Sequence, residues 1–364
     1  MLIVLIAASL LAFLASQSLP QIFAASPAMW AHVALAVGVM TLITAAMQHF
    51  VPVLARTRGA GKWMARLPWL MMAAGVIAVA VFAGVLLFFL VQVAAGVALI
   101  GAIAMVWWMR GRAASALGKP HPGLQWYVAA MACLGLALFA ALLLPWLPQW
   151  HVALRAFHLH LNLYGFVALT AVGTLQVLLP TAAGQPDPHA ALRLRQDLKW
   201  ALLGAFCIAL GAAVWPALSW LGALAWAWVL GRMVWAWRPL FSVRLVSLHG
   251  AEPVLLAAVL GLCAAMLGAV LGDFSSLQIF LPAFLMPLVT GAAGVLAPVW
   301  LNPTQIDKHL AGRSMLNRWA GVRALLFLSA GVLPLLGYQC SGMPALIALF
   351  WFGAVFVIWL WRQS

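Results

Sequence analysis

Residues 67–89 read LPWLMMAAGVIAVAVFAGVLLFF and contain no charged side chain. A helix of about 20 apolar residues crosses the hydrocarbon core of a bilayer, so this stretch predicts a transmembrane helix. The whole chain has the same character, because 67% of its 364 residues are hydrophobic and only 7% are charged. A soluble domain carries about 25% charged residues. We therefore expect residues 1–364 to form a single integral membrane domain in the lipid bilayer, without a soluble domain.

Similar apolar runs recur along the chain and predict twelve spans. They cover residues 2–22, 29–54, 67–89, 92–109, 124–146, 152–179, 197–214, 217–236, 250–271, 278–300, 319–338 and 343–361. The turn between the third and fourth spans is predicted near residues 89–93. The first run is interpreted as a span and not as a removed signal peptide, because no basic residue precedes it.

The basic residues follow every second span, which tests the number of spans. They lie in residues 56–66, 110–119, 193–199, 232–244 and 308–323 and at Arg362, and only Arg155 falls on the other side. Basic loops stay in the cytoplasm, so both termini are expected on the cytoplasmic side of a bacterial-type inner membrane. The basic residues of the cytoplasmic loops thus account for the net charge of +14, and nucleic-acid binding is not expected.

An internal repeat predicts an all-α, polytopic fold of three pseudo-repeats with four helices each, at roughly 1–110, 124–237 and 250–361. An offset of 128 residues places His32 on His160, Gln48 on Gln176 and Pro52 on Pro180. An offset of 246 residues places Pro52 on Pro298, but Gln278 stands where the third histidine would be.

The outer ends of the second and sixth spans carry the richest set of polar side chains. These are His32, His151, Arg155, His158, His160 and Tyr164. Ionisable groups in a bilayer are costly and mark functional sites, and neutral imidazole binds haem iron, copper or zinc. The histidines are therefore candidate ligands of a cofactor. The alternative, that His32 and His160 only form hydrogen bonds with neighbouring helices, stays open at this point.

Helix geometry divides this cluster in two. At 3.6 residues per turn His158 and His160 lie about 200° apart, so they cannot bind one metal ion from a regular helix. His160 shares a face with Tyr164, and His158 shares another with Arg155. The match with His32 favours His160 as the interior ligand. Arg155 would neutralise haem propionates, which would explain its exceptional place among the basic residues.

A second pair, His249 and Glu252, opens the ninth span at its inner end. Residues three apart share a helix face, so this pair could bind a proton or a metal ion. An ordinary pair at the membrane interface is the other interpretation.

These motifs resemble the catalytic subunit I of the haem-copper oxidase superfamily. The patterns that carry the resemblance are His32…Val51-Pro52 and His160-Leu-Asn-Leu-Tyr164. The resemblance implies twelve helices in three groups, a haem b ligand at His32 and a copper or haem ligand at His160. It also implies that Tyr164 is a redox-active, catalytic side chain.

The ligand set is incomplete for an oxidase. Spans seven, eight and ten contain no histidine, so only two of the family's six usual ligands have counterparts. The chain resembles more closely the membrane haem and copper proteins of the nitric oxide response. We expect chemistry on O2 or NO, or electron transfer, with electrons from a redox protein or quinol. A transporter, a metal- or haem-handling factor for oxidase assembly, and a non-catalytic assembly subunit are the alternatives.

Overall fold

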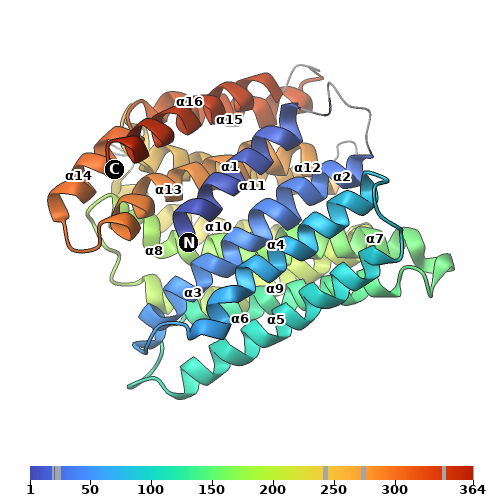
Figure 1. Ribbon diagram of the computed structural model, residues 1–364. Helices are drawn as coiled ribbons and strands as arrows, with labels where there is room; N and C mark the ends of the chain where they lie inside the picture. The colour runs from blue at the N-terminus through green and yellow to red at the C-terminus, as the bar shows by residue number, and fades with distance from the viewer. Residues whose placement is uncertain (19, 21–25, 241–244, 272–275, 338–341, 364) are drawn as a thin grey trace.

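The computed structural model describes residues 1–18, 20, 26–240, 245–271, 276–337 and 342–363, and all regular structure in these ranges is helical. Figure 1 shows a bundle of long helices, which agrees with the predicted all-α, multi-pass membrane protein. Nine helices of the described ranges are long and apolar enough to cross a membrane. Helices also lie at the predicted spans 2–22, 197–214 and 319–338, but these three fall outside that set, so the number twelve stays a prediction.

The helices have the following bounds, with consecutive segments of one rod joined by "then". They are α1 Leu2–Ser18; α2 Pro27–His32 then η2 Val33–Met40 then α3 Thr41–Ala55; α4 Lys62–Phe82; α5 Leu90–Ala114; α6 Gly123–Leu143; η3 Pro148–Trp150 then α7 His151–His160 then η4 Leu161–Val167 then α8 Ala168–Ala182; α9 Ala190–Ala213; α10 Ala217–Ala236; η5 Arg238–Leu240; α11 Glu252–Leu271; α12 Ser276–Ile279 then η7 Phe280–Leu285 then α13 Met286–Leu301; α14 Ile306–Leu316; α15 Ala320–Leu335; and α16 Gly342–Trp361.

Within the described ranges, three of the rods contain a π-helical segment, namely η2, η4 and η7. The offset of 128 residues maps η2 onto η4 within one residue, and the offset of 246 residues maps η7 inside η2. π-Helices form well under 1% of residues in proteins and are frequent at functional sites. These segments therefore mark the three rods that the sequence repeat equates.

The turn between α4 and α5 was predicted at the wrong place. The predicted span of residues 67–89 ends at Phe82, and a turn over residues 83–89 leads to α5. Gly84 adopts a φ of +75° there, a left-handed conformation that glycine adopts without steric cost. The turn residues Val85 and Leu87 are exposed although they are apolar, so hydropathy could not distinguish the turn from the helix.

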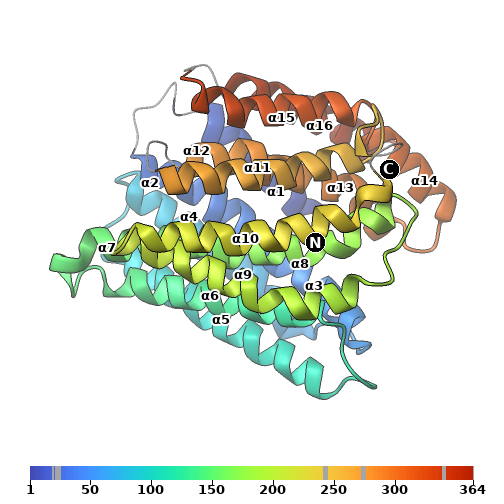
Figure 2. The ribbon, with the colours of Figure 1, turned by 180° about the vertical axis from the view of Figure 1, so that it is seen from behind.

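Two rods form the interior of the bundle, residues 148–182 and residues 277–301, which are the most deeply buried of the nine. α1 packs against η2, α3, α13 and α16, so the first and last helices are neighbours. α9 and α10 pack against each other on the face seen in Figure 2, and α10 otherwise contacts mainly α11. α10 is therefore peripheral, whereas α9 also packs against α7 and η4.

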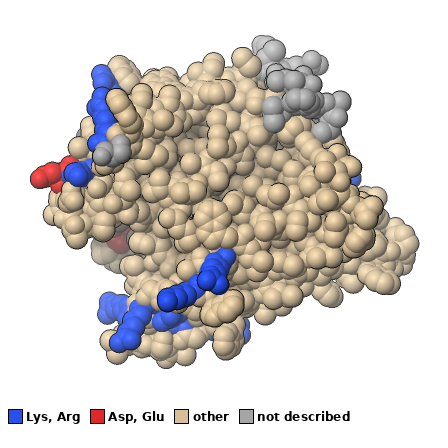
Figure 3. All heavy atoms as spheres, viewed as in Figure 1, with Lys and Arg blue, Asp and Glu red and all other residues tan. Residues whose placement is uncertain are grey.

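Charged side chains are concentrated at one end of the bundle. In Figure 3, Lys and Arg gather on the side of α14 and of the turns after α3 and α5, and the broad surface between the ends is free of charge. This surface suits a lipid environment. We call the end with the basic loops the inner end and the opposite end, with α7, the outer end.

Candidate functional site

His32 is the last residue of α2 and directly precedes the π-helix η2. Its Nδ1 lies 2.7 Å from the carbonyl oxygen of Ala28, one turn earlier in the same helix. Its ring is half-buried and packs on Phe82 of α4, with 4.7 Å between the ring centroids. The carbonyl and the phenyl ring thus hold the imidazole in one orientation.

His158 and His160 are held by carbonyl oxygens in the same way. Nδ1 of His158 lies 2.8 Å from the oxygen of Ala137 in α6, and Nδ1 of His160 lies 2.9 Å from that of Ala156. Both rings are half-buried. His160 directly precedes the π-helix η4, as His32 precedes η2. These two histidines therefore share their helical context as well as their alignment.

A carbonyl oxygen only accepts, so Nδ1 must carry the proton in all three neutral rings. Nε2 then carries the lone pair that a metal ion needs. Metal-binding histidines almost always donate their other N–H to a carbonyl or carboxylate. No hydrogen bond joins Nε2 of His32 or His160 to a described residue, and Nε2 of His158 lies 3.5 Å from Nδ2 of Asn162. The rings are thus set in the tautomer of metal ligands.

His158 and His32 belong to different rods and interact electrostatically, without a hydrogen bond or ring contact between them in the described part of the chain. His160 instead faces Tyr164, with 6.2 Å between nearly parallel rings. The predicted division of His158 and His160 onto separate faces agrees with this arrangement.

Tyr164 is fully buried in η4. Its hydroxyl donates to the carbonyl oxygen of Ala265 in α11 at 3.0 Å, and its ring packs edge-on against Phe280 of η7. This side chain therefore connects the π-helices of the second and third predicted repeats. Whether it takes part in redox chemistry stays a prediction, since this hydrogen bond also gives it a structural role.

Arg155 and His151 lie on the exposed surface of α7, at the outer end. Arg155 forms no ion pair within the described ranges. Its guanidinium is free to neutralise an anionic group that lies beside the histidines. His151 has a solvated imidazole on the same helix and is a suitable control residue.

A three-ligand metal site is absent from the described part of the chain, where no group of three or more His, Cys, Asp or Glu side chains could hold a metal ion. The described residues therefore do not bring three such donors together around one metal ion. No known protein family, curated protein or solved structure matches this chain.

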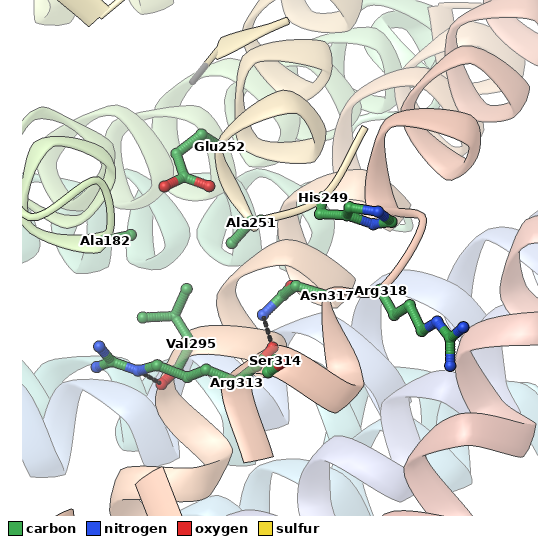
Figure 4. Close-up of a pocket in the computed structure, with 10 residues that line it drawn as sticks. Ala182, His249, Ala251, Glu252, Val295, Arg313, Ser314, Asn317 and Arg318 are labelled. Carbon is green, nitrogen blue, oxygen red and sulfur yellow. Dashed lines mark hydrogen bonds between the residues drawn. The ribbon is translucent and has the colours of Figure 1, made fainter. Parts of the chain in front are cut away.

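A second polar region lies at the inner end, in a cavity of about 540 Å³ shown in Figure 4. Its polar walls come from the start of α11, from α14 and from the turn after α14. Nε of Arg313 donates to the oxygen of Val295 at 3.1 Å, and Nδ2 of Asn317 donates to the oxygen of Gly294 at 3.0 Å. Neither residue was a candidate in the sequence, because each lies within the predicted basic loop of residues 308–323 without any recognisable motif.

His249 and Glu252 do not share a helix face, so that prediction was wrong. α11 begins at Glu252, and Gly250 before it has a φ of +99°, which no α-helix contains. Figure 4 shows the two side chains pointing apart on either side of Ala251. Nδ1 of His249 accepts the backbone N–H of Trp319 at 3.1 Å.

The sequence also missed a buried polar network, because α9 begins at Ala190 and not near residue 197. Nε of Arg193 donates to Oε1 of Gln176 at 2.8 Å, and the same guanidinium pairs with Asp187 at 2.7 Å. Asp197 is fully buried and pairs with Arg232 of α10 at 3.1 Å. The match of Gln48 with Gln176 was a signal that could have pointed to this network.

We expect Asp197→Ala to destabilise the protein by about 2 kcal/mol. Removal of one member of a buried ion pair leaves the other charge uncompensated, at a cost of about 3–5 kcal/mol, and Arg232 is still partly exposed, which reduces the loss. Thermal unfolding in detergent measures the effect. In a double-mutant cycle with Arg232→Gln, coupling of about 1 kcal/mol or more is expected, and additive effects would contradict the ion pair.

The tenth predicted span contains Pro282, Pro287, Gly291 and Gly294, a composition that would suit the broken helix of a transporter. In the structure this rod is helical from Ser276 to Leu301. The π-helix η7 accommodates Pro282, and Pro287 lies in the first turn of α13. A helix can contain proline at such positions without unwinding.

Proposed function

We propose that this chain binds a haem or a copper ion at the outer end of its bundle and acts on a diatomic gas or in electron transfer. The observation that supports this most is the common state of His32, His158 and His160. Each ring is fixed through Nδ1 on a carbonyl oxygen, which leaves Nε2 as a ligand. His32 and His160 donate to carbonyl oxygens one turn earlier in their own rods, so these hydrogen bonds do not join neighbouring helices.

Residues of this chain would have the following roles in that site. His32 and His158 would hold the group through Nε2 from two rods, and Arg155 would neutralise propionates at the outer interface. A bound haem or copper ion would supply one-electron chemistry and a position for O2 or NO. The apolar surroundings would exclude water from the site. Electrons would come from a redox protein or a quinol.

The proposal includes twelve spans in three pseudo-repeats, with both termini in the cytoplasm of a bacterial-type inner membrane. The three π-helices at matched positions support the repeat. The concentration of basic residues at one end supports the orientation.

The experiment compares oxidised and dithionite-reduced visible spectra of the purified protein in detergent, together with its iron and copper content. A Soret band with sharp reduced bands is expected for haem, and copper without a Soret band would identify the metal alone. His151→Ala, on the exposed face of α7, should leave either signal unchanged. A colourless, metal-free protein that elutes as a single folded species would refute the proposal.

A metal- or haem-handling factor for oxidase assembly is the second candidate. One observation favours it: within the described residues the donors are too few for a complete copper site, as suits a site that releases its cargo. Transfer of haem or copper to a recipient oxidase would identify this role, whereas turnover of O2 or NO would identify the first. Transport is the remaining alternative, for which the inner cavity beside Arg313 offers an entrance.

A further inference from the structure

A groove between α9 and α10 opens at the inner end, on the face of the bundle seen in Figure 2. Its volume is about 570 Å³, and its walls include Leu192, Arg193, Trp228, Arg232 and Trp235. Trp228 and Trp235 are more than half exposed. The floor contains Gly231, where a side chain would meet no atom within 4 Å.

The cations of this groove are fixed in position. Arg232 pairs with the buried Asp197 through one terminal nitrogen, and its other terminal nitrogen donates to Gln196 at 2.7 Å. The guanidinium also lies over the ring of Trp228, at 5.8 Å from the centroid. At the rim, the guanidinium of Arg238 stacks on Trp235 at 4.4 Å. Guanidinium groups held in this way lose little entropy when they bind a phosphate.

An apolar stripe on α10 leads from the bilayer to the groove. Leu221, Leu224 and Trp228 are exposed and follow each other at helical spacing. An acyl chain can lie along this stripe while its headgroup reaches Arg232 and Trp235. Asp187 and Asp197 pair with Arg193 and Arg232 of the walls, so among the described residues the uncompensated positive charge beside the groove is that of Arg238, which stacks on Trp235.

We propose that this groove binds one anionic phospholipid of the inner leaflet. Basic pockets between helices on the cytoplasmic side bind anionic headgroups in this manner. Tryptophan is enriched at the level of the headgroups, where Trp228 and Trp235 would lie. The groove shares no residue with the histidine cluster at the outer end, so the proposed lipid site does not depend on the proposed cofactor.

The test uses full-length protein in detergent, titrated with phosphatidylglycerol or phosphatidylcholine and analysed by native mass spectrometry. One phosphatidylglycerol molecule should be retained in preference to phosphatidylcholine. Gly231→Leu fills the groove and should weaken this binding by about tenfold, as expected for the loss of one or two headgroup contacts. Gly111→Leu is the matched control, since Gly111 is an exposed glycine at the inner end of α5 with equally open surroundings.

A second variant, Arg238→Gln, removes a rim charge without touching the pair of Arg232 and Asp197. It should also weaken the retention of phosphatidylglycerol, even if Gly231→Leu does not fold. Equal retention of the two lipids, or unchanged binding in the variant that folds, would overturn the proposal. Displacement of the lipid by excess inorganic phosphate would overturn it too, in favour of a site for the free anion.

Discussion

Protein that lacks both His32 and His158 is expected to retain less than about a tenth of the haem or copper of the unaltered chain. Loss of even an outer-shell partner of a ligand costs about 10–100-fold in metal affinity, and this double variant removes the two ligands themselves. His32 and His158 come from separate rods and interact electrostatically, so the double variant removes one donor from each rod. Metal analysis and the visible spectrum measure the loss.

Each single variant, His32→Ala and His158→Ala, should lower the cofactor content on its own. His151→Ala is the control on the same helix, and its imidazole is exposed. His160→Ala distinguishes a site formed by His32 and His158 from a site that also includes His160, since His160 faces Tyr164. Full cofactor content in both single variants would contradict the assignment of these ligands.

Substitution of Gly261 by alanine is expected to destabilise the bundle by at least about 3 kcal/mol, since overpacking of this severity lies at the upper end of observed costs. Gly261 of α11 faces the backbone of the π-helix η7. A Cβ atom there would stand 1.8 Å from the carbonyl oxygen of Ala283 and 2.2 Å from its carbonyl carbon. These are backbone atoms that cannot rotate away, so the two helices would have to separate.

Thermal unfolding and monodispersity in detergent test this prediction. Gly353→Ala in α16 is the matched control, because its Cβ would meet nothing within 4 Å. That variant should be neutral or more stable by up to about 1 kcal/mol, as is usual when a helical glycine becomes alanine. A Gly261→Ala protein as stable as the Gly353→Ala protein would show that α11 and η7 do not approach as closely as described.

The membrane character of the chain could be predicted because it depends on local quantities. Apolar length gives a span regardless of its neighbours, and the alternation of basic loops gives a consistent orientation. The turn over residues 83–89 could not be found in this way. It depends on the backbone conformation of one residue, Gly84, inside an apolar run.

The candidate site was predictable only in its composition. The sequence predicted the histidines and Tyr164 as candidates, and helix geometry placed His158 and His160 on separate faces. The repeat suggested His160 as the counterpart of His32. A sequence offset matches positions in two helices, however, and does not require the two side chains to be neighbours in space. The packing of α7 against α6 places the His158 ring on the carbonyl oxygen of Ala137, and such tertiary contacts are invisible in one sequence.

The inner end was harder to predict, because charged residues there were interpreted as loop residues. Asp197 lies in the second turn of α9 and is fully buried, since Arg232 of the next helix neutralises it. A buried carboxylate needs such a partner, and the partner is 35 residues away in the sequence. No local pattern relates the two.

X-ray absorption at the iron and copper edges of the purified protein tests the central claim most directly. Imidazole nitrogens produce characteristic multiple scattering around the metal that they bind. We predict a nitrogen shell with this signature, which weakens in His158→Ala and is unchanged in His151→Ala. A protein without stoichiometric iron or copper, or a metal shell of oxygen or sulfur alone, would contradict the claim that these histidines hold a cofactor.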